Sequence, residues 1–288
     1  MPWYIFALLA AILDATYYML VKKFLKDLDP YLLGAGAFLS AFILMFIASA
    51  FHGFPVLGPQ FYYALIAHSI LKIIAAVLYY RALSTTDLSL AMPMISFTPV
   101  FLIFTSYVLL HEQPSHIGIL GILLIVFGSY ILNLQSKTRS FLALFRSVFS
   151  NKGVLSMLLV AFIFSITSNY DKIIVLNSDA IFGTAIGYLL LGIALLFISG
   201  KKITQFPEVL KNNASKFVLF AIIIAAGAIT YNHAIKLQIV PYVISIKRVG
   251  APFSVIYGAW IFHEKNIAKR AIGALIMFCG VILILIFA

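Results

Sequence analysis

Two adjacent cations, Lys247 and Arg248, lie within a hydrophobic stretch that reads YVISIKRVGAPF over residues 242–253. Arginine offers a planar fork that fits phosphate or carboxylate, and lysine offers a compact positive charge. The pair therefore predicts a binding site for an anionic group. Two other roles remain open: an ion pair with Asp14 or Asp171, and side chains that extend along the helix toward a polar environment.

A third cation, Lys72, lies in the hydrophobic stretch 60–83, one helical turn after His68. We predict that Lys72 and His68 line the same anion site, with an ion pair between Lys72 and Asp14 as the alternative. The embedded charges are four cations and two carboxylates: Lys72, Lys172, Lys247 and Arg248 against Asp14 and Asp171. This surplus favours an anionic ligand, although Lys172 stands at the end of its stretch, where it could extend outward.

The two embedded carboxylates, Asp14 and Asp171, are predicted to act as counter-ions or to carry a coupling proton. Tyr231 and Asn232 are predicted to bind a polar ligand, because phenol and amide groups both form hydrogen bonds. A tyrosine near a helix end can equally belong to the aromatic belt at a membrane surface.

Three prolines, Pro93, Pro99 and Pro252, fall inside hydrophobic stretches. Proline removes a backbone donor and interrupts the helical hydrogen-bond ladder. We predict hinges at these positions, with static kinks as an equal alternative.

The composition requires a lipid environment around these residues. Apolar residues make up 63% of the 288 positions and charged residues only 10%, with a mean hydropathy of +1.08, which excludes an ordinary soluble domain. Windows of about 20 residues give ten hydrophobic segments without strand-like alternation. These segments are 2–22, 31–51, 60–83, 88–110, 115–134, 152–175, 181–199, 215–238, 241–262 and 267–287. The predicted class is an all-α polytopic membrane protein with ten transmembrane helices.

The net charge of +11 reflects membrane topology rather than nucleic-acid binding. Most of the 20 Lys and Arg residues fall in the loops after the first, third, fifth, seventh and ninth segments. The positive-inside rule places these loops in the cytoplasm and both termini outside. The lipid bilayer is an expected partner, because the basic loops attract anionic lipids. We expect the plasma (inner) membrane. The single cysteine, Cys279, excludes an intrachain disulfide.

The two halves of the chain resemble each other. At an offset of 152 residues, the pair His111-Glu112 corresponds to His263-Glu264, Gly121 to Gly273, and Gly128 to Gly280; at an offset of 150, Asp29 corresponds to Asp179. Five segments per half is an odd number, so the second copy is inverted. We predict a first repeat at 1–135, a basic linker at 136–151 and a second repeat at 152–288, with the substrate site near the midplane.

Two stretches carry a family resemblance: YYRALSTTDLSLAMPMISFTPVFLIFTSYVLLHE at 79–112 and GILGILLIVFGSYIL at 118–132. They resemble the third-to-fifth-helix signature of the EamA-type drug/metabolite transporter superfamily, and residues 231–284 are similar. The resemblance implies a ten-helix carrier without ATP hydrolysis that often exports metabolites. The pair at 247–248 also resembles the Lys-Arg in the ninth helix of triose-phosphate translocators, which implies phosphate binding. Many members have cytoplasmic termini, whereas the loop charges predict the opposite orientation.

The sequence does not predict an enzyme. The stretch from His111 to His116 has HExxxH spacing and contains Pro114, so it lacks the ligand geometry of the HExxH zinc motif, and capping of a helix end is the better interpretation. There is no Gly-rich phosphate loop, and we predict no metal and no cofactor.

The sequence predicts a secondary active transporter of a small polar metabolite, with an organic anion (phosphorylated or carboxylated) as the preferred substrate. An exporter of zwitterions, in which Asp14 meets the amine, is the first alternative. A lipid-headgroup flippase is an alternative of another class. Coupling to a proton or a counter-substrate, and a monomeric or homodimeric state, are expected.

Overall fold

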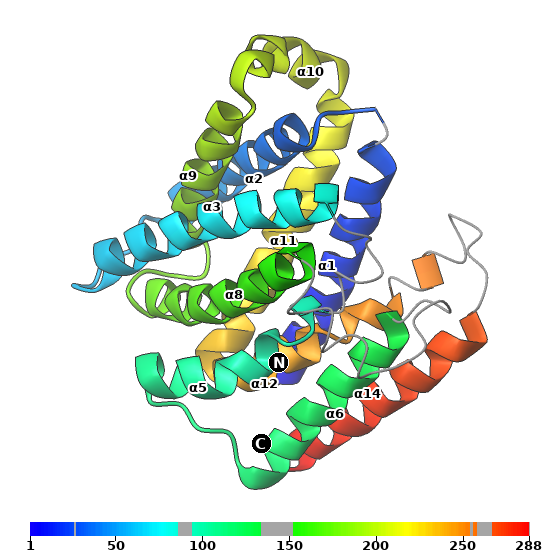
Figure 1. Ribbon diagram of the computed structural model, residues 1–288. Helices are drawn as coiled ribbons and strands as arrows, with labels where there is room; N and C mark the ends of the chain where they lie inside the picture. Colours follow the sequence, from blue (N-terminus) through cyan, green and yellow to red (C-terminus); the bar gives the residue numbers. More distant parts are fainter. Residues whose placement is uncertain (26, 86–93, 134–151, 254–255, 258–266, 288) are drawn as a thin grey trace. The chain divides into compact units, whose positions relative to one another are not determined.

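The structure is a computed structural model that describes residues 1–25, 27–85, 94–133, 152–253, 256–257 and 267–287 (Figure 1). All regular secondary structure in these ranges is helical. The elements are α1 (Trp3–Phe24), α2 (Pro30–His52), α3 (Phe61–Thr85), α5 (Thr98–Leu110), α6 (His116–Asn133), α8 (Lys152–Leu176), α9 (Phe182–Ile198), η1 (Gly200–Gln205), α10 (Phe206–Asn212), α11 (Ala214–Leu237), α12 (Val240–Lys247) and α14 (Ile267–Phe287). Each of the ten hydrophobic segments contains one of these helices.

Five helices are long and apolar enough to cross a bilayer, or up to six if α9 and the η1–α10 segment, bent by 114°, count as one span. Three shorter apolar helices lie at Thr98–Leu110, His116–Leu132 and Ala271–Phe287. On α2, Ile43, Ile47 and Phe51 are exposed at helical spacing, as expected for a face in contact with lipid. The predicted class of all-α membrane protein is confirmed.

The described chain forms two compact units that do not follow the two halves of the sequence. Unit 1 comprises residues 1–73 and 170–237, and unit 2 comprises residues 74–169 and 238–288. Each unit therefore takes helices from both halves.

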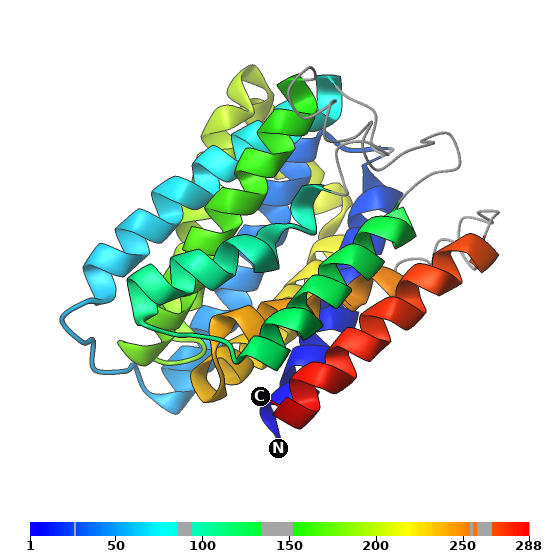
Figure 2. The ribbon, with the colours of Figure 1, turned by 60° about the horizontal axis from the view of Figure 1, so that its bottom comes forward.

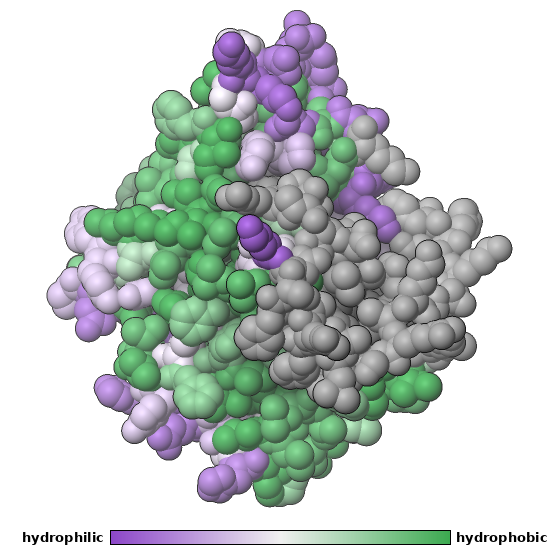
Figure 3. All heavy atoms as spheres, in the orientation of Figure 1, coloured by the Kyte–Doolittle hydropathy of each residue, from purple (hydrophilic) through white to green (hydrophobic). Residues whose placement is uncertain are grey.

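In unit 1, α2 packs on α9, and α11 packs on both α1 and α2. Phe217 and Phe220 of α11 are buried in a core with Leu33 and Ala37 of α2. Figure 3 shows hydrophilic side chains gathered over α10, in contrast to the mostly hydrophobic side chains elsewhere on the visible face. The bend after α9 thus places a polar segment at the end of an apolar helix.

Two aspartates cap helices in unit 1. Asp29 Oδ1 accepts hydrogen bonds from the amides of Tyr31 and Leu32 at the start of α2. At the corresponding place in the second half, Asp179 Oδ1 accepts hydrogen bonds from the amides of Ile181, just before α9, and Phe182, its first residue. Caps of this kind satisfy helix-end donors that would otherwise lack partners.

In unit 2, α6 and α14 lie side by side and antiparallel (Figure 2). A Cβ added to Gly128 would lie 2.6 Å from the carbonyl oxygen of Gly273, and one added to Gly280 would lie 2.6 Å from that of Gly121. Only glycine permits this approach of two backbones. The 152-residue offset converts each of these contacts into the other, as expected for two equivalent repeats.

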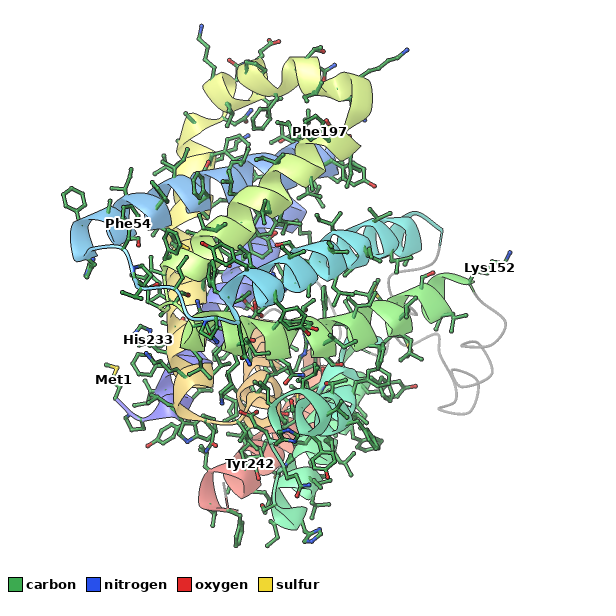
Figure 4. The ribbon with its side chains drawn as sticks, turned by 90° about the vertical axis from the view of Figure 1, so that its left-hand side faces the viewer. Met1, Phe54, Lys152, Phe197, His233 and Tyr242 are labelled. Atoms are coloured by element: carbon green, nitrogen blue, oxygen red, sulfur yellow. The ribbon has the colours of Figure 1, made fainter. Side chains whose placement is uncertain are left out.

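Unit 2 also confirms the capping role of the His-Glu pair. His111 adopts a left-handed conformation (φ 55°) and ends α5. Glu112 Oε2 accepts a 2.8 Å hydrogen bond from the amide of Val240, the first residue of α12. The hydroxyl of Tyr242, which is labelled in Figure 4, accepts a 2.9 Å hydrogen bond from the amide of Ser115, just before α6. These bonds join segments more than a hundred residues apart.

The segment 241–262 is interrupted immediately after Lys247. Helix α12 ends there, and residues 248–249 form a tight turn in which the amide of Val249 donates to the carbonyl of Ile246 (2.9 Å), three residues back. Helix resumes at residues 250–253. Pro252 explains the turn, because it cannot donate to the carbonyl of Arg248, which instead accepts from Ala251 (3.0 Å).

The segment 88–110 is interrupted in the same way. The amide of Phe97 donates to the carbonyl of Met94 (3.1 Å), and α5 begins at Thr98 with Pro99 in its first turn. Pro99 leaves the carbonyl of Ile95 without its helical donor, and the Thr98 hydroxyl supplies one at 2.7 Å. Both prolines therefore start a helix after a short turn. Pro93 lies outside the described residues.

Candidate functional site

A polar cluster in unit 1 is centred on Asp171, near the end of α8. His68 Nε2 of α3 lies 3.0 Å from Asp171 Oδ1, and the hydroxyl of Tyr231, from α11, donates to Asp171 Oδ2 at 3.3 Å. Two helices thus place one side chain each beside a carboxylate that a third helix carries. These residues were all predicted as site residues, and the structure brings them together.

Tyr188 of α9 belongs to the same region. Its phenol interacts electrostatically with both Asp171 and Asp14. On α11, the Cβ position of Gly227 lies 4.0 Å from Asp14 Oδ1, so Asp14 faces this helix from α1. Unit 1 therefore holds both embedded carboxylates near one tyrosine, in a setting where each buried charge needs polar partners.

Asn232 has a different environment from its neighbour Tyr231. Its Nδ2 donates to the carbonyl of Ala180 and to the hydroxyl of Thr184, each at 2.7 Å, and the residue is buried. The two hydrogen bonds thus join α11 to α9 and to the turn that precedes it. Substrate binding by Asn232 stays a prediction and depends on its carbonyl oxygen.

The cations of the predicted anion site fall in both units. Lys72 is partly buried on α3 in unit 1, one turn beyond His68. Lys247 is the last residue of α12 in unit 2, Arg248 follows in the turn, and both are partly buried. A helix C-terminus carries partial negative charge, which favours cations at this place. The predicted ion pairs of Lys247 or Arg248 with Asp14 or Asp171 join residues of different units and stay hypotheses.

The sequence analysis missed Tyr188 and two further polar contacts. Tyr63 and Tyr170 are joined through their hydroxyls at 2.9 Å in unit 1. In unit 2 the buried Asn169 accepts from the hydroxyl of Ser106 at 2.7 Å. Tyrosines in apolar helices give little signal in sequence, since they are typical of membrane surfaces. Throughout the described ranges, no group of three or more His, Cys, Asp and Glu residues could hold a metal ion.

Apolar helices, inverted repeats and embedded polar groups define a polytopic membrane protein of the kind found among carriers. A sequence model of the EamA-like transporter family matches residues 1–134 and again residues 151–286. The chain belongs to the EamA-like transporter family, and it is a transporter-family member rather than an enzyme. The resemblance to this family is confirmed, while the likeness of residues 247–248 to triose-phosphate translocators stays a prediction.

A solved structure titled "Crystal structure of protein" has a similar fold. It matches over 99% of this chain and 98% of its own, with a TM-score of 0.78 and 15% sequence identity. At this identity the likeness shows the fold alone. No curated protein matches the chain.

Proposed function

We propose that this protein is a secondary active transporter that moves a small organic anion, phosphorylated or carboxylated, by alternating access. Membership of the EamA-like family supports transport across a membrane. The observation that supports an anion is the position of Lys247 and Arg248 at the interruption of a membrane segment. Interrupted helices are the usual places where carriers bind charged solutes.

The side chains at the turn support this proposal. Lys247 and Arg248 carry two full positive charges, which attract an anion more strongly than the helix end, with about −0.5 elementary charge, repels it. An anionic group offers the geometry that a guanidinium fork and an ammonium satisfy together.

The remaining features of the proposal come from the sequence. Both repeats rock around the turns before Pro99 and Pro252, and Asp14 and Asp171 serve as counter-ions or coupling groups. The protein lies in the plasma (inner) membrane with both termini outside, as a monomer or a homodimer, and neither metal nor cofactor takes part. Loop charges support this orientation.

A zwitterionic substrate is the second candidate. It is favoured by the two carboxylates, Asp14 and Asp171, that act on Tyr188 in unit 1. One of them would meet the amine of an amino acid while a cation meets its carboxylate.

Counterflow in liposomes tests the proposal. Purified protein is reconstituted with internal unlabelled solute, and uptake of labelled glucose 6-phosphate, malate or alanine is followed. We expect malate or glucose 6-phosphate to exchange, and Lys247→Ala or Arg248→Ala to reduce the rate about tenfold or more, since each removes a charge-assisted bond. The matched control is Lys236→Ala, which removes an exposed cation from the last turn of α11.

Each contrary result has a distinct meaning. Anion exchange that survives both substitutions contradicts the anion site. Exchange of alanine alone favours the zwitterion exporter. Exchange of headgroup-labelled lipid, without exchange of any soluble solute, favours a lipid-headgroup flippase.

A further inference from the structure

Among the described residues, six lysines gather at the end of unit 1 where α1 ends and α2 and α11 begin. They come from the last turn of α1, the η1–α10 segment and the first turn of α11, and they are Lys22, Lys23, Lys201, Lys202, Lys211 and Lys216. Five of them are exposed, and Lys216 is partly buried. We call this set the lysine surface.

Contacts within unit 1 hold the elements of the lysine surface together. Lys202 Nζ lies 2.6 Å from Oδ2 of Asp29, the residue that caps α2. Lys216 Nζ lies 4.9 Å from the centre of the ring of Phe24, the last residue of α1. On α10, Val209 packs against the core formed by α1, α2 and α11. The lysines therefore belong to one folded region rather than to separate loops.

The η1–α10 segment is amphipathic and turns away from the span that precedes it. The bend between α9 and this segment is 114°, and Gly200 at the bend has a φ of +60°, a backbone conformation that favours glycine. Apolar side chains at helical spacing are partly buried, whereas the lysines between them are exposed. The partly buried residues are Ile203, Phe206, Val209 and Leu210. A cationic amphipathic segment of this kind is typical of a membrane surface.

The lysine surface lies next to side chains that contact the lipid hydrocarbon. Phe197, labelled in Figure 4, is 73% exposed near the end of α9 and precedes Lys201 by four residues. Val218 of α11 is 59% exposed and follows Lys216 by two residues. Exposed apolar side chains on membrane spans contact acyl chains, and a helix rises about 1.5 Å per residue. The lysines are therefore within about one helical turn of the hydrocarbon, at the level of the headgroups.

We propose that the lysine surface binds the phosphate groups of anionic phospholipids in the adjoining leaflet. The described residues of the same segments carry three carboxylates, Asp27, Asp29 and Glu208, so positive charge is in excess. Ammonium groups bind phosphate through charge-assisted hydrogen bonds, and an anionic membrane surface attracts each nearby lysine. A lipid fits better than a soluble anion, because its acyl chains contact exposed residues such as Phe197 and Val218. The inference is independent of the transported solute.

A binding titration in detergent tests the lysine surface. The full chain is titrated with fluorescently labelled phosphatidylglycerol, which is anionic, or with labelled phosphatidylcholine, which has no net charge, and fluorescence anisotropy gives Kd. We expect the wild-type protein to bind phosphatidylglycerol about tenfold or more tightly, since each lysine near an anionic surface contributes about fivefold. The double variant Lys201→Gln/Lys211→Gln should lose most of this preference. High salt should weaken the preference of the wild-type protein, because ions screen exposed charges.

Lys236→Gln is the matched control. It removes an exposed lysine from the last turn of α11, at the opposite end of that helix from Lys216, and should keep the wild-type preference. Lys201 and Lys211 are exposed, and the ion pair of Lys202 with Asp29 does not involve them. The melting temperature of the double variant in detergent should therefore stay close to that of the wild-type protein.

Hydrogen exchange in nanodiscs locates the bound lipid. The amides of residues 200–216 should exchange more slowly in phosphatidylglycerol than in phosphatidylcholine, and this difference should disappear in Lys201→Gln/Lys211→Gln. Protection confined to other segments would place the lipid elsewhere and overturn the inference.

Two further results would also overturn it. One is an equal Kd for the two lipids in the wild-type protein, or a preference that survives in the double variant. The other is competition by soluble glycerol 3-phosphate as strong as that by unlabelled phosphatidylglycerol, which would show a site for free phosphate rather than for lipid. Each of these results leaves the proposed transport function standing.

Discussion

The two interrupted segments of the chain have the same backbone and different chemistry. In one, the amide of Phe97 bonds to the carbonyl of Met94; in the other, the amide of Val249 bonds to the carbonyl of Ile246. These residues correspond at the 152-residue offset, and each turn precedes a proline. The repeat therefore dictates where the helices are interrupted.

The side chains at the two turns differ. In the first turn, Ser96 forms a 2.8 Å hydrogen bond with Ser129 of α6, and both are buried. Their counterparts in the second half are Arg248 and Val281. Valine has no hydroxyl, so the bond that fastens the first turn cannot form at the second. The two repeats therefore share one backbone turn. The second turn carries the cations Lys247 and Arg248, and the first turn carries the uncharged Ile95 and Ser96 at the corresponding positions.

The largest expected effect concerns the symmetric frame. Gly128→Ala places a methyl group against the carbonyl of Gly273, and Gly273→Ala does the reverse, 2.5 Å from the carbonyl of Gly128. Each should destabilise the protein by about 1–3 kcal/mol, because α6 and α14 must separate. Thermal unfolding in detergent measures the loss. Gly227→Ala is the control, and a loss at only one of the paired glycines would contradict the symmetry.

Much of this frame could be predicted from sequence. Hydrophobicity located the helices of eight segments to within a few residues, since the bilayer fixes the length of an apolar helix, but it did not show the interruptions in 88–110 and 241–262. The corresponding glycines 121, 128, 273 and 280 indicated a close helix contact. The sequence could not show that Glu112 caps α12, or that His68 meets Asp171, because such contacts join distant parts of the chain. The predicted boundary between the repeats, at 136–151, also did not indicate the two compact units, because each unit takes helices from both halves.

A smaller effect is expected at the corresponding caps Asp29 and Asp179. Asp29→Ala and Asp179→Ala should each cost about 1 kcal/mol through loss of an N-terminal cap. The two differ in one respect: Lys202 Nζ lies 2.6 Å from Asp29 Oδ2. A common loss at both sites supports equivalent roles, and thermal unfolding of the two variants in detergent checks it.

The charge on Asp29 makes its contribution dependent on pH. Burial alone raises the pKa of this carboxyl, but Lys202 and the amides of Leu32 and Tyr31 outweigh it and leave the pKa below its usual value of 3.8. The stabilisation is therefore present above that pH and lost as the pH falls through the lowered pKa. Asp29→Asn keeps the cap and removes the charge, so its melting temperature should fall less on acidification than that of the wild-type protein. Identical acid profiles would contradict this account.

The smallest expected effect concerns the serine pair of the first turn. Ser96→Ala leaves the buried Ser129 hydroxyl without this partner and should cost about 1 kcal/mol. The double variant Ser96→Ala/Ser129→Val gives α6 the valine that α14 carries at the corresponding place, and it should recover most of the loss because both polar groups are removed. Melting temperatures of the single and double variants make the test. A double variant less stable than the single one would show that the first turn needs its bond.

The central claim is that Lys247 and Arg248, at the second turn, bind an anion. Its most direct test is the rise in melting temperature that glucose 6-phosphate or malate produces in the wild-type protein and in the double variant Lys247→Gln/Arg248→Gln. Ligand that binds the folded state alone stabilises by about 2.7 kcal/mol at a hundredfold excess over Kd. The account predicts a rise with one of these anions in the wild-type protein and none in the double variant. An equal rise in the two proteins would contradict it.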